Sequence, residues 1–200
     1  MNKKFERRLR KFADSEAARR LRNGRTGIEK ESLRVTPEGY IATTPHPPAL
    51  GSALTHPYIT TDYSEALLEF ITPPFPRLGD TLAFLEQIHL FTYRHLKNEL
   101  LWAASMPCMV GDEAGIPIAR YGTSNVGRMK HTYRRGLSYR YGRLMQIISG
   151  VHFNYSLPER FWAPFQEFSG AGGVRRHFVS DSYFAMIRNF QRLGWIIPYL

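Results

Sequence analysis

Hydrophobic and polar residues follow two different periods along the chain. In residues 3–22, apolar side chains recur at roughly helical spacing with Lys and Arg opposite them, which predicts an amphipathic helix. Apolar and polar residues alternate loosely in residues 28–35 and cleanly in residues 148–157, which predicts two strands. We therefore expect helices and strands in the same chain.

End signals predict two further helices. Asp80 is a good N-cap for a helix over about 81–98, and Ser180 or Asp181 for one over about 181–193 that Gly194 closes. The segments between the predicted elements include two irregular loops rich in Pro or Gly. These loops are residues 43–58 and 105–127. The first is long enough to suggest a function.

The segment 60–72 fits either a helix or a strand. In a helix, Asp62 and Glu65 would form a pair resembling a capping box, which is a structural role. In a strand, Glu65 and Glu69 would share a face with Leu67. A carboxylate among aliphatic side chains is costly unless something binds it. The residues alone leave both alternatives open.

Two carboxylates in the first predicted strand suggest a metal site. Glu29 and Glu31 are two residues apart, so in a strand they share a face with Cα atoms about 6.7 Å apart. Neighbouring carboxylates raise each other's pKa unless a cation lies beside them, and oxygen ligands suit Mg²⁺. The structural alternative is an exposed, charged strand face.

The second predicted strand carries an imidazole and an amide on one face. Alternation sends His152 and Asn154 to the same side, with Val151, Phe153 and Tyr155 on the other. Such side chains can bind a metal or a substrate. The structural alternative is a histidine that is satisfied within the core.

Charge is distributed unevenly along the chain. The formal net charge is +10, yet residues 31–113 contain ten acidic and only four basic residues, whereas residues 114–158 contain seven basic residues and no acidic one. An acidic stretch between basic ones suits a site that handles metal and phosphate together. A basic nucleic-acid-binding surface is the alternative, although no nucleic-acid motif supports it. No apolar run is long enough to cross a membrane.

The basic stretch contains a spacing of two glycines that resembles a phosphate loop. Gly122 and Gly127 have four residues between them, but Arg128 and Met129 follow where Lys and Ser or Thr are required, so the motif fails. Tyr133, Arg134 and Arg135 remain candidates for binding carboxylate or phosphate. The alternative is a solvated basic face.

Several blocks in the correct order resemble the proteobacterial type of the glutamate–cysteine ligase (γ-glutamylcysteine synthetase) family. The resemblance runs from about residue 24 to the last residue. The blocks are Gly27–Val35, Leu50–His56, Thr60–Pro73, Ser105–Cys108, Tyr121–Asn125 and Gly150–Asn154.

The resemblance implies an α+β glutamine-synthetase-like ligase fold, in which a curved, mainly antiparallel sheet has helices on its outer face. It favours a strand for segment 60–72. It also implies ATP-dependent ligation of the L-glutamate γ-carboxylate to the L-cysteine amine through a γ-glutamyl phosphate. That reaction is the first step of glutathione biosynthesis. Mg²⁺ or Mn²⁺ would serve as cofactor and ATP as co-substrate.

The resemblance also implies roles for nine residues. Glu29 and Glu69 would be catalytic as well as metal-binding. Tyr63 and Tyr133 would line the cysteine pocket, Asn154 would contact glutamate, and Arg134 would contact phosphate or carboxylate. The implied metal ligands are Glu29, Glu31, Asp62, Glu69 and His152. Glu65 is expected to be structural.

We expect residues 1–23 to form an N-terminal helix. Because family members are much longer, we expect residues 24–200 to form the N-terminal portion of a truncated ligase domain. Further metal and phosphate ligands would then lie beyond residue 200, and the fragment alone would be inactive. We expect a cytoplasmic protein that binds neither nucleic acid nor a membrane. The residues leave its oligomeric state open and favour a monomer. Another carboxylate–amine ligase of the same superfamily is the nearest alternative, and a nucleic-acid-binding module is the second.

Overall fold

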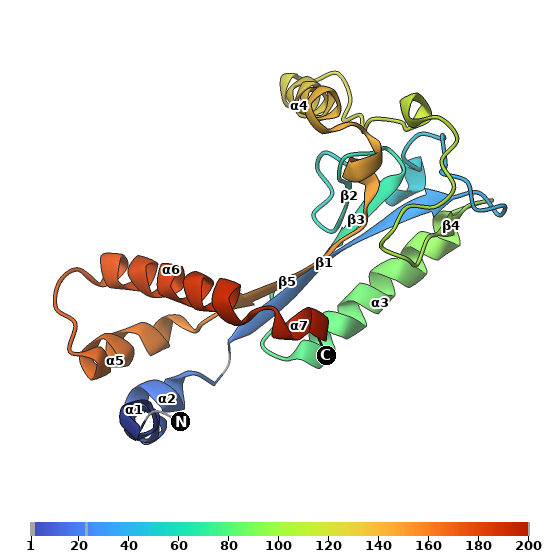
Figure 1. The fold of residues 1–200 in the computed structure, drawn as a ribbon. Helices are drawn as coiled ribbons and strands as arrows, with labels where there is room; N and C mark the ends of the chain where they lie inside the picture. The colour runs from blue at the N-terminus through green and yellow to red at the C-terminus, as the bar shows by residue number, and fades with distance from the viewer. Residues whose placement is uncertain (1–2, 23, 200) are drawn as a thin grey trace. The chain divides into compact units, whose positions relative to one another are not determined.

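The computed structural model describes residues 3–22 and 24–199. The chain divides into two compact units. One contains residues 26–155 and is built on a sheet, whereas the other joins the two ends of the chain, up to residue 25 and from residue 156, and is helical (Figure 1). None of the helices among the described residues has both the length and the apolar character of a membrane span.

The sheet is centred on its longest strand, β1 (Arg25–Val35). The strand order is β2–β3–β1–β4, and β5 also pairs with β1. The β1–β3, β2–β3 and β1–β4 pairs are antiparallel, as predicted. The other strands are β2 (Ile59–Thr61), β3 (Leu67–Ile71), β4 (Leu100–Leu101) and β5 (Val151–Ser156). The two predicted strands therefore correspond to β1 and β5, and β3 decides segment 60–72 in favour of a strand.

Alternation along β1 and β3 gives the sheet two buried faces. Leu33 and Leu67 pack on one face with the buried Ile116 and Ile147. Leu68 and Phe70 pack on the other face, which helix α3 (Leu78–His95) covers. Three short 3₁₀ helices complete this unit together with α4 (Asn125–Tyr141). They are η1 (Pro48–Leu50), η2 (Glu113–Gly115) and η3 (Leu144–Ile147).

Helix α3 starts earlier than the sequence predicts. Asp80 is its third residue rather than its N-cap, and it accepts hydrogen bonds from Arg77, at the N-cap position, over 2.7 and 2.9 Å. An acidic residue in the first turn is favoured by the helix dipole, which explains the misplaced start. The helix also ends at His95, before the predicted residue 98.

Helix α4 is absent from the prediction, which extends a loop to residue 127. Its only buried residue is Gly127, so it has no apolar stripe that a periodicity argument could detect. The hydroxyl of Ser124 caps it by accepting a hydrogen bond from the Gly127 amide. A Cβ on Gly127 would clash with the carbonyl oxygen of Tyr121, which explains why glycine stands there.

Gly127→Ala is therefore expected to destabilise the chain by about 1–3 kcal/mol, because the clash with a backbone carbonyl exceeds the gain in helix propensity of about 1 kcal/mol. Gly136→Ala in the same helix is the matched control, because its Cβ would meet nothing within 4 Å. It should stabilise the chain by up to about 1 kcal/mol. Urea unfolding of both variants measures the two effects, and equal signs would contradict the steric explanation.

The helical unit has its own aromatic core. Ala17, Phe161 and Trp162 are buried there. Its helices are α1 (Lys3–Ala13), α2 (Glu16–Arg20), α5 (Glu159–Ser169), α6 (Arg175–Leu193) and α7 (Ile196–Tyr199).

The helices at the two ends of the chain differ from the sequence prediction. The single helix predicted for residues 3–22 is two helices, because Ser15 caps α2 by accepting a hydrogen bond from the Ala18 amide. Helix α5 is not predicted. Helix α6 starts before Ser180 and ends at Leu193, with Gly194 at its C-cap as expected.

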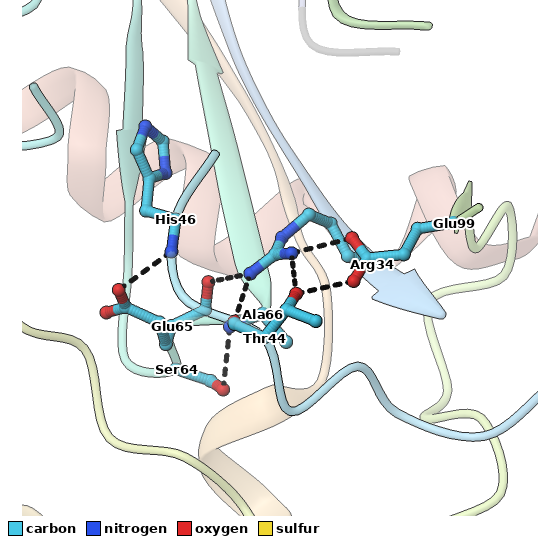
Figure 2. Close-up of polar contacts among 7 residues, drawn as sticks. All are labelled: Arg34, Thr44, His46, Ser64, Glu65, Ala66 and Glu99. Carbon is cyan, nitrogen blue, oxygen red and sulfur yellow. Dashed lines mark hydrogen bonds and ion pairs between the residues drawn. The ribbon is translucent and has the colours of Figure 1, made fainter. Parts of the chain in front are cut away.

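A buried polar cluster lies at the end of β1 (Figure 2). The Arg34 side chain is fully buried and pairs with Glu99 over 2.6 Å. Its guanidinium also donates to the Thr44 hydroxyl and to the carbonyl oxygens of Thr44 and Glu65. The cluster thereby ties the loop before η1 and the turn before β3 to the central strand.

Candidate functional site

The register of the sheet places two carboxylates directly opposite each other. Glu31 of β1 pairs with Glu69 of β3, and Glu29 pairs with Ile71. Like charges directly opposite in an antiparallel pair are destabilising, because their Cβ atoms are only about 5 Å apart. The repulsion between these two carboxylates lowers the stability of the fold, and a bound cation would offset it.

Strand β5 adds the imidazole and the amide on the other side of β1. Nδ1 of His152 lies 2.9 Å from one carboxylate oxygen of Glu29, and the Asn154 amide donates to the other oxygen over 2.9 Å. The backbone amide of Gly150 donates to the Glu31 carboxylate over 2.7 Å. His152 is therefore an exposed partner of Glu29 rather than a core histidine.

Three of the five predicted metal ligands converge. Glu29, Glu69 and His152 each offer a ligand atom, and these atoms all lie within 4.8 Å of one another. Carboxylate oxygens with one imidazole nitrogen form a donor set that suits Mg²⁺ or Mn²⁺. Glu31 and Asp62 border this trio, since the charge of each raises the pKa of Glu69.

The electrostatics of the site indicate a shortage of positive charge. Burial, followed by the charges of Asp62, Glu31 and Glu29, raises the pKa of Glu69 to about 7. Burial also raises the pKa of Glu31, although the hydrogen bond from Gly150 opposes it. The hydrogen bond with Glu29 raises the pKa of His152. A divalent cation would reverse these shifts for the carboxylates, so the residues fit such an ion.

Asp62 is held through its backbone. Its carbonyl oxygen accepts hydrogen bonds from the Tyr121 hydroxyl, over 3.0 Å, and from Nε of Arg134. The Arg134 guanidinium lies 4.7 Å from the centre of the Tyr121 ring, and one of its nitrogens lies 4.0 Å from the Asp62 carboxylate. Arg134 thus lies beside a predicted metal ligand. Its predicted role was to contact a phosphate or carboxylate group.

The two predicted cysteine-pocket tyrosines differ in accessibility. Tyr63 is 1% exposed and packs in the core with Leu33 and Ile116. Tyr133 is 65% exposed on α4. The structure therefore does not bring Tyr63 to an open surface. Glu65 has the structural role expected of it, because its carboxylate accepts hydrogen bonds from the backbone amides of His46 and Arg120.

Two contributors to the site are absent from the predicted set. The backbone amide of Gly150 binds Glu31, and the hydroxyl of Tyr121 binds the carbonyl of Asp62. Both lie in blocks that carry the family resemblance, Tyr121–Asn125 and Gly150–Asn154. A backbone donor cannot be identified from residue type, and a tyrosine in an apolar segment is predicted to be a core residue. The blocks that carry the family resemblance were therefore the only signal in the sequence for these two contributors.

Comparison with known proteins identifies the family. The sequence model for glutamate–cysteine ligase matches residues 9–200. The chain is 54% identical over 198 residues to a glutamate–cysteine ligase of Alcanivorax borkumensis, covering 99% of this chain and 38% of that protein. It is 59% identical over 174 residues to one of Pseudomonas fluorescens, covering 87% of this chain and 33% of that protein. The chain thus spans little more than a third of the length of these curated relatives.

Solved structures agree with this result. A glutamate–cysteine ligase of Francisella tularensis in complex with AMP matches 89% of this chain and 34% of its own, with a TM-score of 0.82 and 40% identity. A bifunctional glutathione synthetase of Pasteurella multocida matches 100% of this chain and 25% of its own, with a TM-score of 0.81 and 34% identity. The predicted α+β fold class is confirmed. The chain belongs to the glutamate–cysteine ligase family.

Proposed function

We propose that this chain supplies the metal-binding floor of an ATP-dependent ligase, which joins the γ-carboxylate of L-glutamate to the amine of L-cysteine. The convergence of Glu29, Glu69 and His152 on adjacent strands is the observation that carries the proposal. Membership of the family supplies the reaction class, and the AMP in the Francisella tularensis structure supports a nucleotide substrate. The cytoplasm is the proposed location.

Glu29, Glu69 and His152 would hold Mg²⁺ or Mn²⁺, with Glu31 and Asp62 as further carboxylates. Such an ion supplies the positive charge that phosphoryl transfer from ATP to a carboxylate requires. Glu29 is oriented for this role by Asn154, whose amide fixes one of its oxygens while His152 contacts the other. Arg134 would retain Asp62 through the contact with its carbonyl.

The substrate assignments rest on the family resemblance. Tyr133 is accessible and would contact cysteine directly, whereas Tyr63 would need to leave the core to do so. Asn154 would contact glutamate while remaining bound to Glu29. These three roles are therefore the part of the proposal that mutation of single residues should test first.

The test uses the complete ligase that contains this sequence, because the chain spans only 33–38% of its relatives. Phosphate release from ATP with glutamate is expected to depend on both Mg²⁺ and cysteine. Equal release with other amines in place of cysteine would instead indicate another carboxylate–amine ligase. The 200-residue chain alone is the negative control and is expected to release no phosphate.

A further inference from the structure

A cavity of about 320 Å³ lies beside α4, and none of the residues that line it belongs to the carboxylate cluster of Glu29, Glu31, Asp62 and Glu69. Residues 114–118 form one part of its lining, and four residues between positions 120 and 143 form the rest. The basic residues that line it are Arg120, His131, Arg135 and Arg143. None of the residues that line it is acidic. A concave surface with three guanidinium groups and no carboxylate has an excess of positive charge.

The side chains are anchored by contacts that leave donors available. One guanidinium nitrogen of Arg143 donates to the carbonyl oxygens of Ala114 and Ile116 over 2.6 and 3.0 Å, which leaves its remaining N–H groups for a ligand. Nδ1 of His131 lies 2.8 Å from the carbonyl oxygen of Ala119, so Nε2 remains available. These contacts reduce the entropy lost when a ligand orders these two side chains.

The segment that carries Arg120 is fixed as well. Its backbone amide donates to the buried Glu65 carboxylate over 2.6 Å, which neutralises no charge on the Arg120 side chain. Glu113 is the acidic residue nearest in sequence to the cavity wall, and one oxygen of its carboxylate accepts hydrogen bonds from the backbone amides of Arg143 and Leu144. The guanidinium charges at the cavity are thus not matched by a neighbouring acid in any described contact.

We propose that this cavity binds a small multivalent oxyanion, with phosphate or carboxylate groups. Guanidinium groups bind such oxygens with charge-assisted, bidentate hydrogen bonds. The volume lies at the lower end of the range for ligand pockets, which fits an anion the size of pyrophosphate or citrate rather than a nucleotide. Helix α4 then serves two sites, because Arg134 contacts Asp62 whereas the next residue, Arg135, lines the cavity.

The test is calorimetric titration of this chain with pyrophosphate and with citrate, without divalent cations and at constant ionic strength. Saturable binding with one site per chain is expected. Arg135→Gln and Arg120→Gln should each weaken it about tenfold, the effect of losing one hydrogen bond to a charged group. Binding of pyrophosphate but not citrate would show that the cavity selects phosphate groups. Binding of both would show that it accepts small polyanions of either kind. The proposal does not depend on the proposed ligase activity.

Arg140→Gln is the matched control, because Arg140 lies exposed on the same helix and does not line the cavity. It removes the same charge and should leave the affinity unchanged within about twofold. An equal loss in all three variants would overturn the proposal by showing that only the general positive field attracts the anion. Failure of the unmodified chain to saturate would overturn it as well. Circular dichroism of each variant separates loss of binding from loss of fold.

Discussion

Glu69→Gln is expected to stabilise the metal-free chain and to abolish most of its response to Mg²⁺. Burial and three neighbouring carboxylates raise the pKa of Glu69 to about 7, so the folded state resists its ionisation. Glutamine has nearly the same shape and no charge to repel. Above the pKa of about 7 the gain should be about 1–3 kcal/mol, allowing for partial exposure of the site.

The pH dependence has a definite sign. Because the folded-state pKa of Glu69 lies above its ordinary value of 4.5, this residue lowers stability as the pH rises from about 4.5 to about 7. Below that window both folded and unfolded states carry the proton, so the benefit of Glu69→Gln disappears. Urea unfolding at pH values on either side of the window measures this difference.

Addition of Mg²⁺ should make the unmodified chain more stable than the Glu69→Gln variant, which inverts their order in the absence of metal. The ion would bind the ionised Glu69 with Glu29 and His152 and stabilise the unmodified chain by mass action, whereas the variant has lost one of these three ligands. Glu86→Gln on the exposed side of α3 is the control and should respond to Mg²⁺ as the unmodified chain does. If Mg²⁺ stabilised the Glu69→Gln variant as much as the unmodified chain, Glu69 would not be a ligand of the metal.

In the complete ligase, the same substitution should lower kcat by about a hundredfold or more, because removal of a group that stabilises transition-state charge costs that much. Stability and activity are then expected to change in opposite directions. That combination is typical of a functional site, where residues are retained despite their cost to the fold. If Glu69 were only a structural carboxylate, its substitution would lower stability and activity together.

The strands that carry the site could be predicted because their residues alternate. Glu29, Glu31, His152 and Asn154 occupy the strand positions expected of them, on β1 and β5. Their pairing could not be derived from alternation, since it gives each strand a face but not a neighbour or a register. The opposition of Glu31 to Glu69 is visible only once β3 lies beside β1. The family resemblance, rather than periodicity, supplied that grouping.

The helices were less predictable, for reasons that differ between them. Helix α4 belongs to the sheet unit but buries only Gly127, so its sequence has no apolar stripe. The core of the helical unit joins Ala17 to Phe161 and Trp162, and a contact between residues so far apart in sequence leaves no local pattern. Tyr63 is a different case, because its aromatic ring packs in the core, whereas the pocket role that the resemblance assigned to it stays a prediction.

Arg34→Met is expected to destabilise the chain by about 3–5 kcal/mol, the cost of leaving one partner of a buried ion pair without the other. The Arg34 side chain is 0% exposed and its partner Glu99 only 14%. The substitution removes the Arg34 donors, shown in Figure 2, from the Glu99 carboxylate and from the carbonyl oxygens of Thr44 and Glu65. Urea unfolding at neutral pH measures the loss.

The chain contains a matched exposed pair for comparison. Arg77 and Asp80 also form a short ion pair, at 2.7 Å, but their side chains are 79% and 39% exposed. Arg77→Met should therefore destabilise the chain far less than Arg34→Met. If the two substitutions proved equally mild, burial of Arg34 would contribute nothing to the fold. Arg34→Lys should recover only part of the loss, because an ammonium group lacks the planar fork that reaches several acceptors at once.

The effect of Arg34→Met should also reach the carboxylate cluster. The side chain donates to the carbonyl of Glu65 and the backbone amide to that of Ala66, so Arg34 fixes the turn that leads into β3 and hence Glu69. A folded population of the variant is expected to bind Mg²⁺ more weakly than the Arg77→Met control. Unchanged affinity would mean that the pairing of β1 with β3 alone positions Glu69. Weaker affinity would show that the buried cluster helps to hold the proposed metal site in place.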